Sequence, residues 1–246
     1  MLNILIIGAT SAIAGEVAKR FAAEGARLYL LGRNTERLGR IAADLRIRGA
    51  ESVQTTGFDA KDIESYEQIL EKAHASLERF DVVLVAHGTL GDQKKCETSV
   101  EKTLHEIQIN AVSTIAMLTI IANMMVKQKC GTLAIISSVA GDRGRPSNYV
   151  YGSAKAAVTT FCEGLRGRLF KSGVHVLTIK PGMVDTPMTE GMELPPMLMA
   201  KPEQVARDIV CAIRKKSDII YTPWYWRYVM SGIVHIPEKF FKKMSL

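Results

Sequence analysis

Apolar runs alternate with segments of helical periodicity along almost the whole chain of 246 residues. The first run, residues 2–8, is continuous, as expected of a parallel strand buried on both faces. We expect strands at 2–8, 26–32, 52–59, 80–88, 131–138, 174–182 and 218–223, and helices at 12–25, 34–49, 62–78, 97–128, 149–173 and 201–216. This alternation predicts an α/β fold: a doubly wound, mostly parallel sheet of about seven strands with helices on both faces.

The chain reads as one domain followed by a short tail. No linker, repeat or low-complexity tract interrupts residues 1–222, and a hydrophobic content of 47% is enough to fill one large core. Residues 223–246 are rich in aromatic and basic residues. We expect this tail to pack on the domain, on a partner subunit or on a membrane surface.

Composition argues against several classes of protein. The chain starts directly with a strand pattern and lacks the features of a signal peptide, so we expect none. The four cysteines are scattered and the five histidines form no metal-binding motif, so we expect reduced thiols, a cytoplasmic location and no metal site. The net charge is +7, and residues 214–246 carry seven Lys or Arg against two acidic residues. No nucleic-acid-binding motif accompanies this charge, so we expect no nucleic-acid partner.

The turn after the first strand, GATSAIAG at residues 8–15, has the character of a phosphate-binding turn. Gly8 permits the tight bend, but Ala12 and Ala14 stand where dinucleotide-binding turns usually have glycine. Because alanine resists positive φ and adds a methyl group, the turn can bind a pyrophosphate only if both residues have negative φ and the ligand tolerates one Cβ. The following helix offers its N–H groups, and Thr10 and Ser11 offer hydroxyl groups. Taken alone, the turn leaves both cofactor binding and simple packing open.

A candidate catalytic cluster follows the strand at 131–138. Tyr151 stands thirteen residues after Ser138, and Lys155 lies one helical turn after Tyr151 on the same helix face. A nearby ammonium group lowers the pKa of a phenol, which is ordinarily about 10, and prepares it for general acid–base catalysis. Ser138 could hydrogen-bond the same substrate oxygen.

With this pattern the chain resembles the short-chain dehydrogenase/reductase family, in its compact single-domain form with a Rossmann fold. The resemblance extends from Gly8 to about Pro223. The family's asparagine in the central helix is met by Asn110, and its proline–glycine turn by Pro181 and Gly182. The resemblance implies cofactor contacts at Gly8, Thr10, Ser11, Ala12, Ile13, Arg33, Asn34, Asp59, Ala86, Gly88, Tyr151, Lys155, Pro181, Gly182, Val184 and Thr186. One departure is the family's N-N-A-G segment, which reads VAHG at residues 85–88 with only Gly88 in place.

The resemblance also implies a mechanism. Tyr151 would give a proton to a carbonyl oxygen while a nicotinamide delivers hydride to its carbon. Lys155 would lower the pKa of the tyrosine and bind the nicotinamide ribose, and Ser138 would polarise the carbonyl. Asn110 would support a water that relays protons through Lys155.

The end of the second strand favours NADP(H) over NAD(H). An NAD site usually has a carboxylate here, bonded to the ribose hydroxyls. This chain has Arg33 and Asn34 instead, and Arg33 could pair with a 2′-phosphate. NAD(H) remains the alternative, with Glu36 as the rival ribose ligand.

Two segments bear on the substrate. Residues 187–200 are rich in methionine and could form an apolar lid or complete the core. The tail resembles that of family members acting on lipid-linked sugar ketones, such as decaprenylphosphoryl-keto-pentose reductase, and its aromatic and basic residues suit either peripheral membrane contact or a subunit interface. The substrate is therefore expected to be an apolar or lipid-linked carbonyl compound, with an oxo-acyl group or a small ketone as alternatives.

Two alternative functions and one expectation about assembly concern the whole chain. A non-catalytic dinucleotide-binding scaffold or sensor is the rival to an enzyme, although such proteins often lose the tyrosine or the lysine. A sugar-nucleotide epimerase would need a larger C-terminal domain than this chain offers. By the resemblance, the helices at about 100–128 and 150–171 pair across a two-fold axis, which predicts a homodimer or homotetramer.

Overall fold

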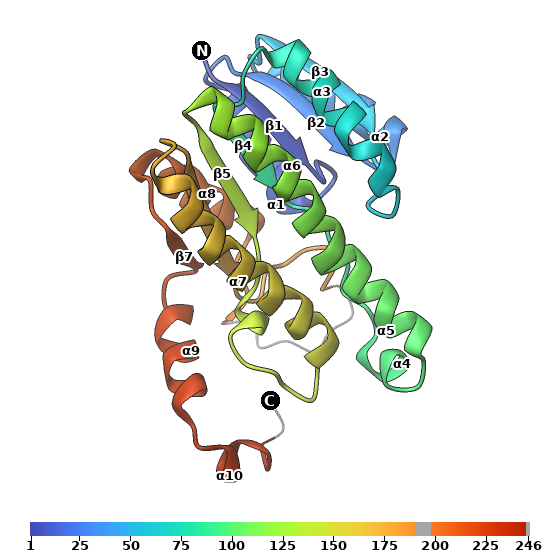
Figure 1. Cartoon of the computed structure of the whole chain (residues 1–246), viewed down its shortest axis with the longest axis vertical. Helices are drawn as coiled ribbons and strands as arrows, with labels where there is room; N and C mark the ends of the chain where they lie inside the picture. The colour runs from blue at the N-terminus through green and yellow to red at the C-terminus, as the bar shows by residue number, and fades with distance from the viewer. Residues whose placement is uncertain (190–197, 245–246) are drawn as a thin grey trace.

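A computed structural model describes residues 1–189 and 198–244 of the chain. Its described strands form one seven-stranded parallel sheet in the order β3-β2-β1-β4-β5-β6-β7 (Figure 1). The strands are β1 (Asn3–Ile7), β2 (Arg27–Gly32), β3 (Ser52–Gly57), β4 (Val82–Val85), β5 (Thr132–Ile136), β6 (His175–Pro181) and β7 (Ile219–Thr222). The doubly wound α/β fold is therefore confirmed.

The helices cover both faces of the sheet, and each face has its own hydrophobic core. On one face lie α1 (Ala12–Ala22), α2 (Thr35–Ile47) and α8 (Pro202–Lys215). On the other lie α3 (Tyr66–Leu77), α6 (Ser113–Gln128) and α7 (Tyr149–Phe170). Strands β1 and β4 are buried along their whole length, which explains their uninterrupted apolar sequences.

The expected helix at 97–128 is present from Val100 to Gln128, with a later start and one π-helical turn inside it. A short helix α4 (Gln93–Glu97) comes first, and α5 (Val100–Ile107) then starts at Ser99, whose side chain accepts a hydrogen bond from the backbone N–H of Lys102. A π-helical turn η2 (Gln108–Val112) joins α5 to α6. The apolar periodicity continues through the start of α5 and through the π-helical turn, so the sequence pattern could not reveal either feature.

The stretch Val100–Gln128 is long and apolar enough to cross a membrane by length and composition alone. More than half of its most apolar window is buried inside the fold, as in the core helix of a globular domain. Its character is thus accounted for by packing on the sheet.

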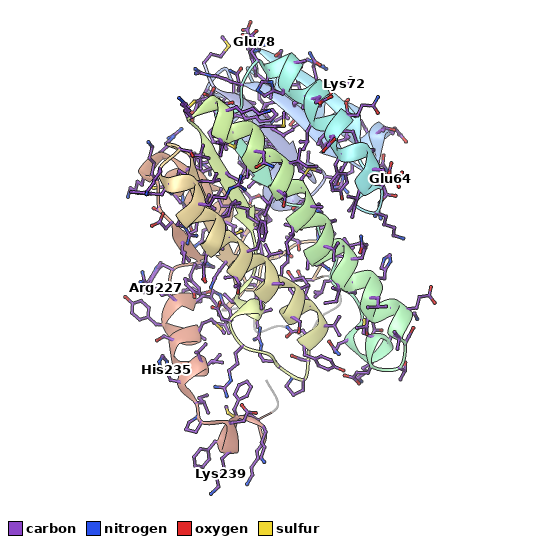
Figure 2. All side chains as sticks on the ribbon, viewed as in Figure 1. Glu64, Lys72, Glu78, Arg227, His235 and Lys239 are labelled. Carbon is purple, nitrogen blue, oxygen red and sulfur yellow. The ribbon has the colours of Figure 1, made fainter. Side chains whose placement is uncertain are left out.

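The tail folds into two helices, which the sequence analysis did not expect. These are α9 (Trp226–His235) and α10 (Glu238–Phe241), at the lower left in Figure 1. Arg227, His235 and Lys239 mark the outer margin of these two helices in Figure 2. The other expected elements are present with ends shifted by a few residues, and a 3₁₀ turn η1 (Ile63–Ser65) precedes α3.

Candidate active site

Ser138, Tyr151 and Lys155 meet at the carboxyl end of β5. Ser138 caps the 3₁₀ turn η3 (Val139–Gly141), and its Oγ accepts a hydrogen bond from the backbone N–H of Ala140 at 3.1 Å. Tyr151 and Lys155 lie in the first turns of α7. A Cβ added at Gly152 would lie 2.8 Å from the Ala140 carbonyl oxygen, so glycine lets α7 pack directly on this turn. The Tyr151 phenol lies near enough to Ser138 for the serine to oppose the rise of its pKa.

The protonation of this pair differs from the expectation. Burial raises the pKa of Tyr151 to about 12, although Ser138 opposes the shift. Burial also lowers the pKa of Lys155 to about 8, so the ammonium group loses its proton more readily than an exposed lysine does. Lys155 Nζ lies 5.6 Å from the centroid of the Tyr151 ring and donates to the Ile136 carbonyl at 3.1 Å. The expected lowering of the pKa of Tyr151 by Lys155 is therefore wrong for this structure, because burial raises the pKa and the opposing effect comes from Ser138.

Asn110 occupies the π-helical turn and is fully buried. Its Oδ1 accepts from the backbone N–H of Thr89 at 3.0 Å. A Cβ added at Gly88 would lie 2.7 Å from Asn110 Oδ1 and 3.6 Å from Lys155 Nζ. The asparagine and the lysine thus flank the same glycine, as the family pattern implies.

In the turn at residues 8–15, Ala12 and Ala14 meet the condition on φ. Gly8 has φ +81°, and a Cβ there would lie 2.5 Å from the His87 backbone nitrogen, so glycine is required. Ala12 begins α1 and Ala14 is buried in the core, both without positive φ. Ser11 at the N-cap makes no side-chain bond to the helix. The first N–H groups of α1, which have no intrahelical acceptors, are those that a phosphate would use.

At the end of β2, Arg33 is exposed and free of any carboxylate within ion-pair distance among the described residues. Asn34 instead caps α2, since its Oδ1 accepts from the backbone N–H of Arg37 at 2.9 Å. Glu36 faces solvent and pairs with Arg40 at 3.7 Å. Of these residues Arg33 is the one placed to meet a 2′-phosphate.

The remaining expected cofactor residues lie at neighbouring strand ends. Asp59 is exposed just after β3, and its Oδ1 accepts from the backbone N–H of Lys61 at 3.0 Å. Ala86 follows β4, and its backbone N–H donates to the Ile7 carbonyl at 2.8 Å. Ile13 is buried in α1. All three line the edge of the sheet where ligands of such folds bind.

The proline–glycine turn after β6 is held from two sides. The backbone N–H of Gly182 donates to the Thr222 carbonyl at 3.0 Å, and Pro181 pairs with Thr222 in register. Beyond it, the Val184 carbonyl accepts from Thr189 Oγ1 at 2.7 Å, and the Thr186 backbone N–H donates to the same hydroxyl oxygen at 3.2 Å. Most of the expected lid, residues 190–197, lies outside the described residues.

Trp226 of the tail helix forms an apolar wall beside this turn. A Cβ added at Gly182 would lie 1.9 Å from Trp226 Nε1, so the indole rests directly on the glycine. Trp226 is buried together with Val139, the neighbour of Ser138, and with Met183 and Leu198. The tail therefore lines the region beside the candidate catalytic serine.

Arg143 holds the tail in this position. Its guanidinium donates to the carbonyls of Ile233 and Val234 in the last turn of α9, and of Ile236 just after it, at 2.6, 3.0 and 2.6 Å. It also pairs with Glu238 at 3.0 Å and lies 3.7 Å from the centroid of the Phe241 ring. The tail is thus packed on the domain, through a residue that directly follows the catalytic turn.

A buried ion pair supports the same turn. Asp142 pairs with Lys180 of β6 at 2.6 Å and accepts from the Tyr221 hydroxyl of β7 at 2.8 Å. Burial of the Tyr221 phenol raises its pKa, and the hydrogen bond to the Asp142 carboxylate raises it further. Sequence reasoning missed this pair. The signal that could have found it is Lys180, a charged residue within an otherwise apolar strand.

Comparisons with known proteins identify the family. A family model described as short chain dehydrogenase matches residues 2–195. An uncharacterized oxidoreductase of Mycobacterium tuberculosis is 36% identical over 241 residues, covering 98% of this chain and 96% of the relative. An uncharacterized oxidoreductase of Streptomyces coelicolor is 34% identical over 243 residues, covering 98% and 95%.

Solved structures show the same fold. An actinorhodin polyketide ketoreductase variant with NADPH superimposes with a TM-score of 0.82 at 21% identity, covering 92% of this chain and 97% of the other. Levodione reductase superimposes with a TM-score of 0.80 at 22% identity, covering 89% and 94%. From its sequence, its fold and these relatives, the chain belongs to the short-chain dehydrogenase family of oxidoreductases.

Proposed function

We propose that the protein is an NADP(H)-dependent carbonyl reductase that uses Ser138, Tyr151, Lys155 and Asn110. The observation that carries the proposal is the position of the serine, the tyrosine and the lysine at the end of β5, where Ser138 caps η3, Tyr151 and Lys155 lie in the first turns of α7, and Lys155 Nζ lies 5.6 Å from the centroid of the Tyr151 ring. When bound, the nicotinamide supplies the hydride. The chain supplies position, charge and a proton.

The protonation state of Tyr151 suits the reduction direction. With its pKa near 12, the phenol carries its proton at neutral pH and can donate it to the carbonyl oxygen that becomes the alcohol. Ser138 Oγ, next to the phenol, would hydrogen-bond the same oxygen. Lys155 would bind the nicotinamide ribose, and its positive charge would then act on the Tyr151 phenol.

The residues present fit a dinucleotide phosphate. Gly8 gives the backbone close approach, the first turn of α1 offers N–H groups, and Ser11 has its side chain free of a helix cap. Exposed Arg33 favours NADP(H), since guanidinium binds phosphate through paired hydrogen bonds. The NADPH in the ketoreductase neighbour is consistent with this choice.

We further propose that the substrate is an apolar or lipid-linked carbonyl compound. Trp226, Val139, Met183 and Leu198 form an apolar cluster beside the catalytic serine. Farther along the tail, Trp224, Tyr228 and Phe240 are exposed near basic side chains, which suits contact with a membrane surface. A small ketone remains the alternative, since the ketoreductase and levodione reductase share the fold.

Thermal unfolding with each cofactor tests the cofactor proposal. A ligand at a hundred times its dissociation constant stabilises the fold by about 2.7 kcal/mol. We expect NADPH to raise the melting temperature and NADH to raise it less at equal concentration. No shift with either would contradict dinucleotide binding. NADPH-dependent turnover of cyclic, bicyclic and long-chain ketones would then define the substrate class.

A further inference from the structure

A buried carboxylate lies behind Asn110. Glu106 of α5 precedes Asn110 by one helical turn and is only 7% exposed. Its Oε2 accepts from Thr89 Oγ1 at 2.9 Å, from the Gly91 backbone N–H at 3.0 Å and from Asn110 Nδ2 at 3.1 Å. Within the described chain, no Lys, Arg or His pairs with it. A carboxylate is rarely buried without a cation, so its retention here calls for a function.

The loop after β4 is built around this acid. A Cβ added at Gly91 would lie 2.6 Å from Glu106 Cδ, so the backbone passes directly over the carboxylate. At the other end of the loop, a Cβ added at Gly88 would lie 2.7 Å from Asn110 Oδ1 and 3.6 Å from Lys155 Nζ, so the backbone there also passes close to both side chains. The loop from Gly88 to Gly91 therefore connects the acid to the lysine.

The acid is one of the groups that hold the Asn110 amide in a single orientation. An asparagine amide has a donor end and an acceptor end of nearly the same shape, and neighbouring groups decide between them. Nδ2 donates to the Glu106 carboxylate and to the Glu106 backbone carbonyl, each at 3.1 Å, and Oδ1 accepts from the Thr89 backbone N–H at 3.0 Å. Because the same carboxylate also accepts from Thr89 and Gly91, it ties the amide to the loop that follows β4.

We propose that Glu106 is a positioning residue that holds the Asn110 amide and the loop from Thr89 to Gly91 in place beside Lys155, so that protons return to Tyr151 along the path from Asn110 through Lys155. The inference rests on the proposed function, because it assigns a part in the proton supply of the same site. It explains the buried acid, the two glycines and the three hydrogen bonds together.

The charge of Glu106 has a second effect that provides a readout. Its negative charge contributes to the raised pKa of Tyr151 on α7, and also to that of Cys96 on α4. Replacing the carboxylate by an amide removes this contribution. The pH midpoint of the reaction, which follows Tyr151, should then move to lower pH. A side chain that merely fills space would leave the midpoint unchanged.

The test compares Glu106→Gln with Glu101→Gln, an exposed acid on the same helix. The probes are NADPH and the ketone that the wild type reduces fastest. A glutamine is uncharged and has one acceptor oxygen, so it holds Thr89, Gly91 and the Asn110 amide together less firmly than the carboxylate does. We expect Glu106→Gln to lower kcat by about tenfold to a hundredfold, with the pH midpoint moved down and the Kd for NADPH unchanged. Glu101→Gln should match the wild type in all three.

Two further variants keep the outcome decisive. Thr89→Val removes a hydroxyl that bonds both Glu106 and Asn110 but leaves the carboxylate, and should lower kcat by a smaller factor; it decides the matter if Glu106→Gln does not fold. Tyr151→Phe reports on the proposed function itself. If Tyr151→Phe abolishes turnover while Glu106→Gln keeps the wild-type kcat and pH midpoint, the role of Glu106 is refuted. If Tyr151→Phe leaves turnover intact, the proposed function fails instead.

Discussion

At the scale of single residues, small changes in side chain decide what the phosphate turn can do. Gly8 alone has a positive φ in this turn and a neighbour that excludes a Cβ, whereas Ala12 and Ala14 sit in an ordinary helix. The two alanines are therefore compatible with the turn's proposed task. The sequence could supply the condition on φ, and only the backbone could show that it is met.

Arg33 should select the cofactor. Replacing it by alanine removes a charged hydrogen-bonding partner, a loss of about 1.5–3 kcal/mol, so NADPH affinity should fall by about tenfold to a hundredfold while NADH affinity stays the same. Isothermal calorimetry with both cofactors measures this. Arg40→Ala, which changes an arginine of the following helix α2 that pairs with Glu36, is the control. An equal loss for both cofactors would show that Arg33 does not read the 2′-phosphate.

His87 should make the fold sensitive to acid. Burial lowers its pKa to about 3, and Nε2 hydrogen-bonds Ser113 Oγ at 2.9 Å. The unfolded chain takes up the proton near pH 6.5, so the stability due to the neutral ring is complete above that pH and is lost as the pH falls toward 3. Between pH 7 and pH 5 the wild type should lose about 2 kcal/mol more than His87→Gln.

Urea unfolding of the wild type and His87→Gln across this range provides the measurement. His235→Gln, which changes an exposed histidine, should follow the wild type. Identical slopes for the wild type and His87→Gln would show that His87 titrates normally in the folded protein.

At the scale of elements, the sequence predicts the order of strands and helices well, because each apolar run and each helical period is a local signal. It misses features that depend on tertiary contacts. The π-helical turn at Asn110 lies inside an unbroken apolar period, and the tail helices are fixed by Arg143, whose partners lie about 90 residues away in the chain. Likewise, the raised pKa of Tyr151 reflects burial, which the spacing to Lys155 does not report.

The turn η3 should depend on the Asp142–Lys180 pair. Replacing Asp142 by alanine leaves a buried ammonium without its partner and should cost about 3–5 kcal/mol of unfolding free energy. Denaturant unfolding with unchanged m-value measures it. Asp44→Ala, which breaks an exposed pair with Arg48, should have little effect. A small loss at Asp142 would mean that the pair is solvated.

At the scale of the whole molecule, the tail packs beside the proposed catalytic site, because Trp226 rests on Gly182 and contacts Val139 of η3. How copies of the chain assemble is a separate question. The proposed two-fold pairing through the helices around 100–128 and 150–171 is supported by exposed apolar side chains there, among them Leu104 and Phe170.

Phe170→Glu should weaken that pairing. Phe170 is 81% exposed at the end of α7, so a charge there costs the isolated fold little but would be buried in a subunit contact. Light scattering after size exclusion should give a dimer or tetramer for the wild type and a smaller species for the variant. A wild type that is monomeric at micromolar concentration would contradict the proposed assembly.

The most direct test of the central claim is the rate of NADPH consumption with an accepted ketone, for the wild type and Tyr151→Phe at saturating cofactor. The variant keeps the ring but loses the proton that the carbonyl oxygen needs. A positioned general acid contributes about a hundredfold to ten-thousandfold, so the rate should fall by at least about a hundredfold with NADPH binding unchanged. Equal rates for the two proteins would contradict the assignment of Tyr151 and, with it, the proposed reductase mechanism.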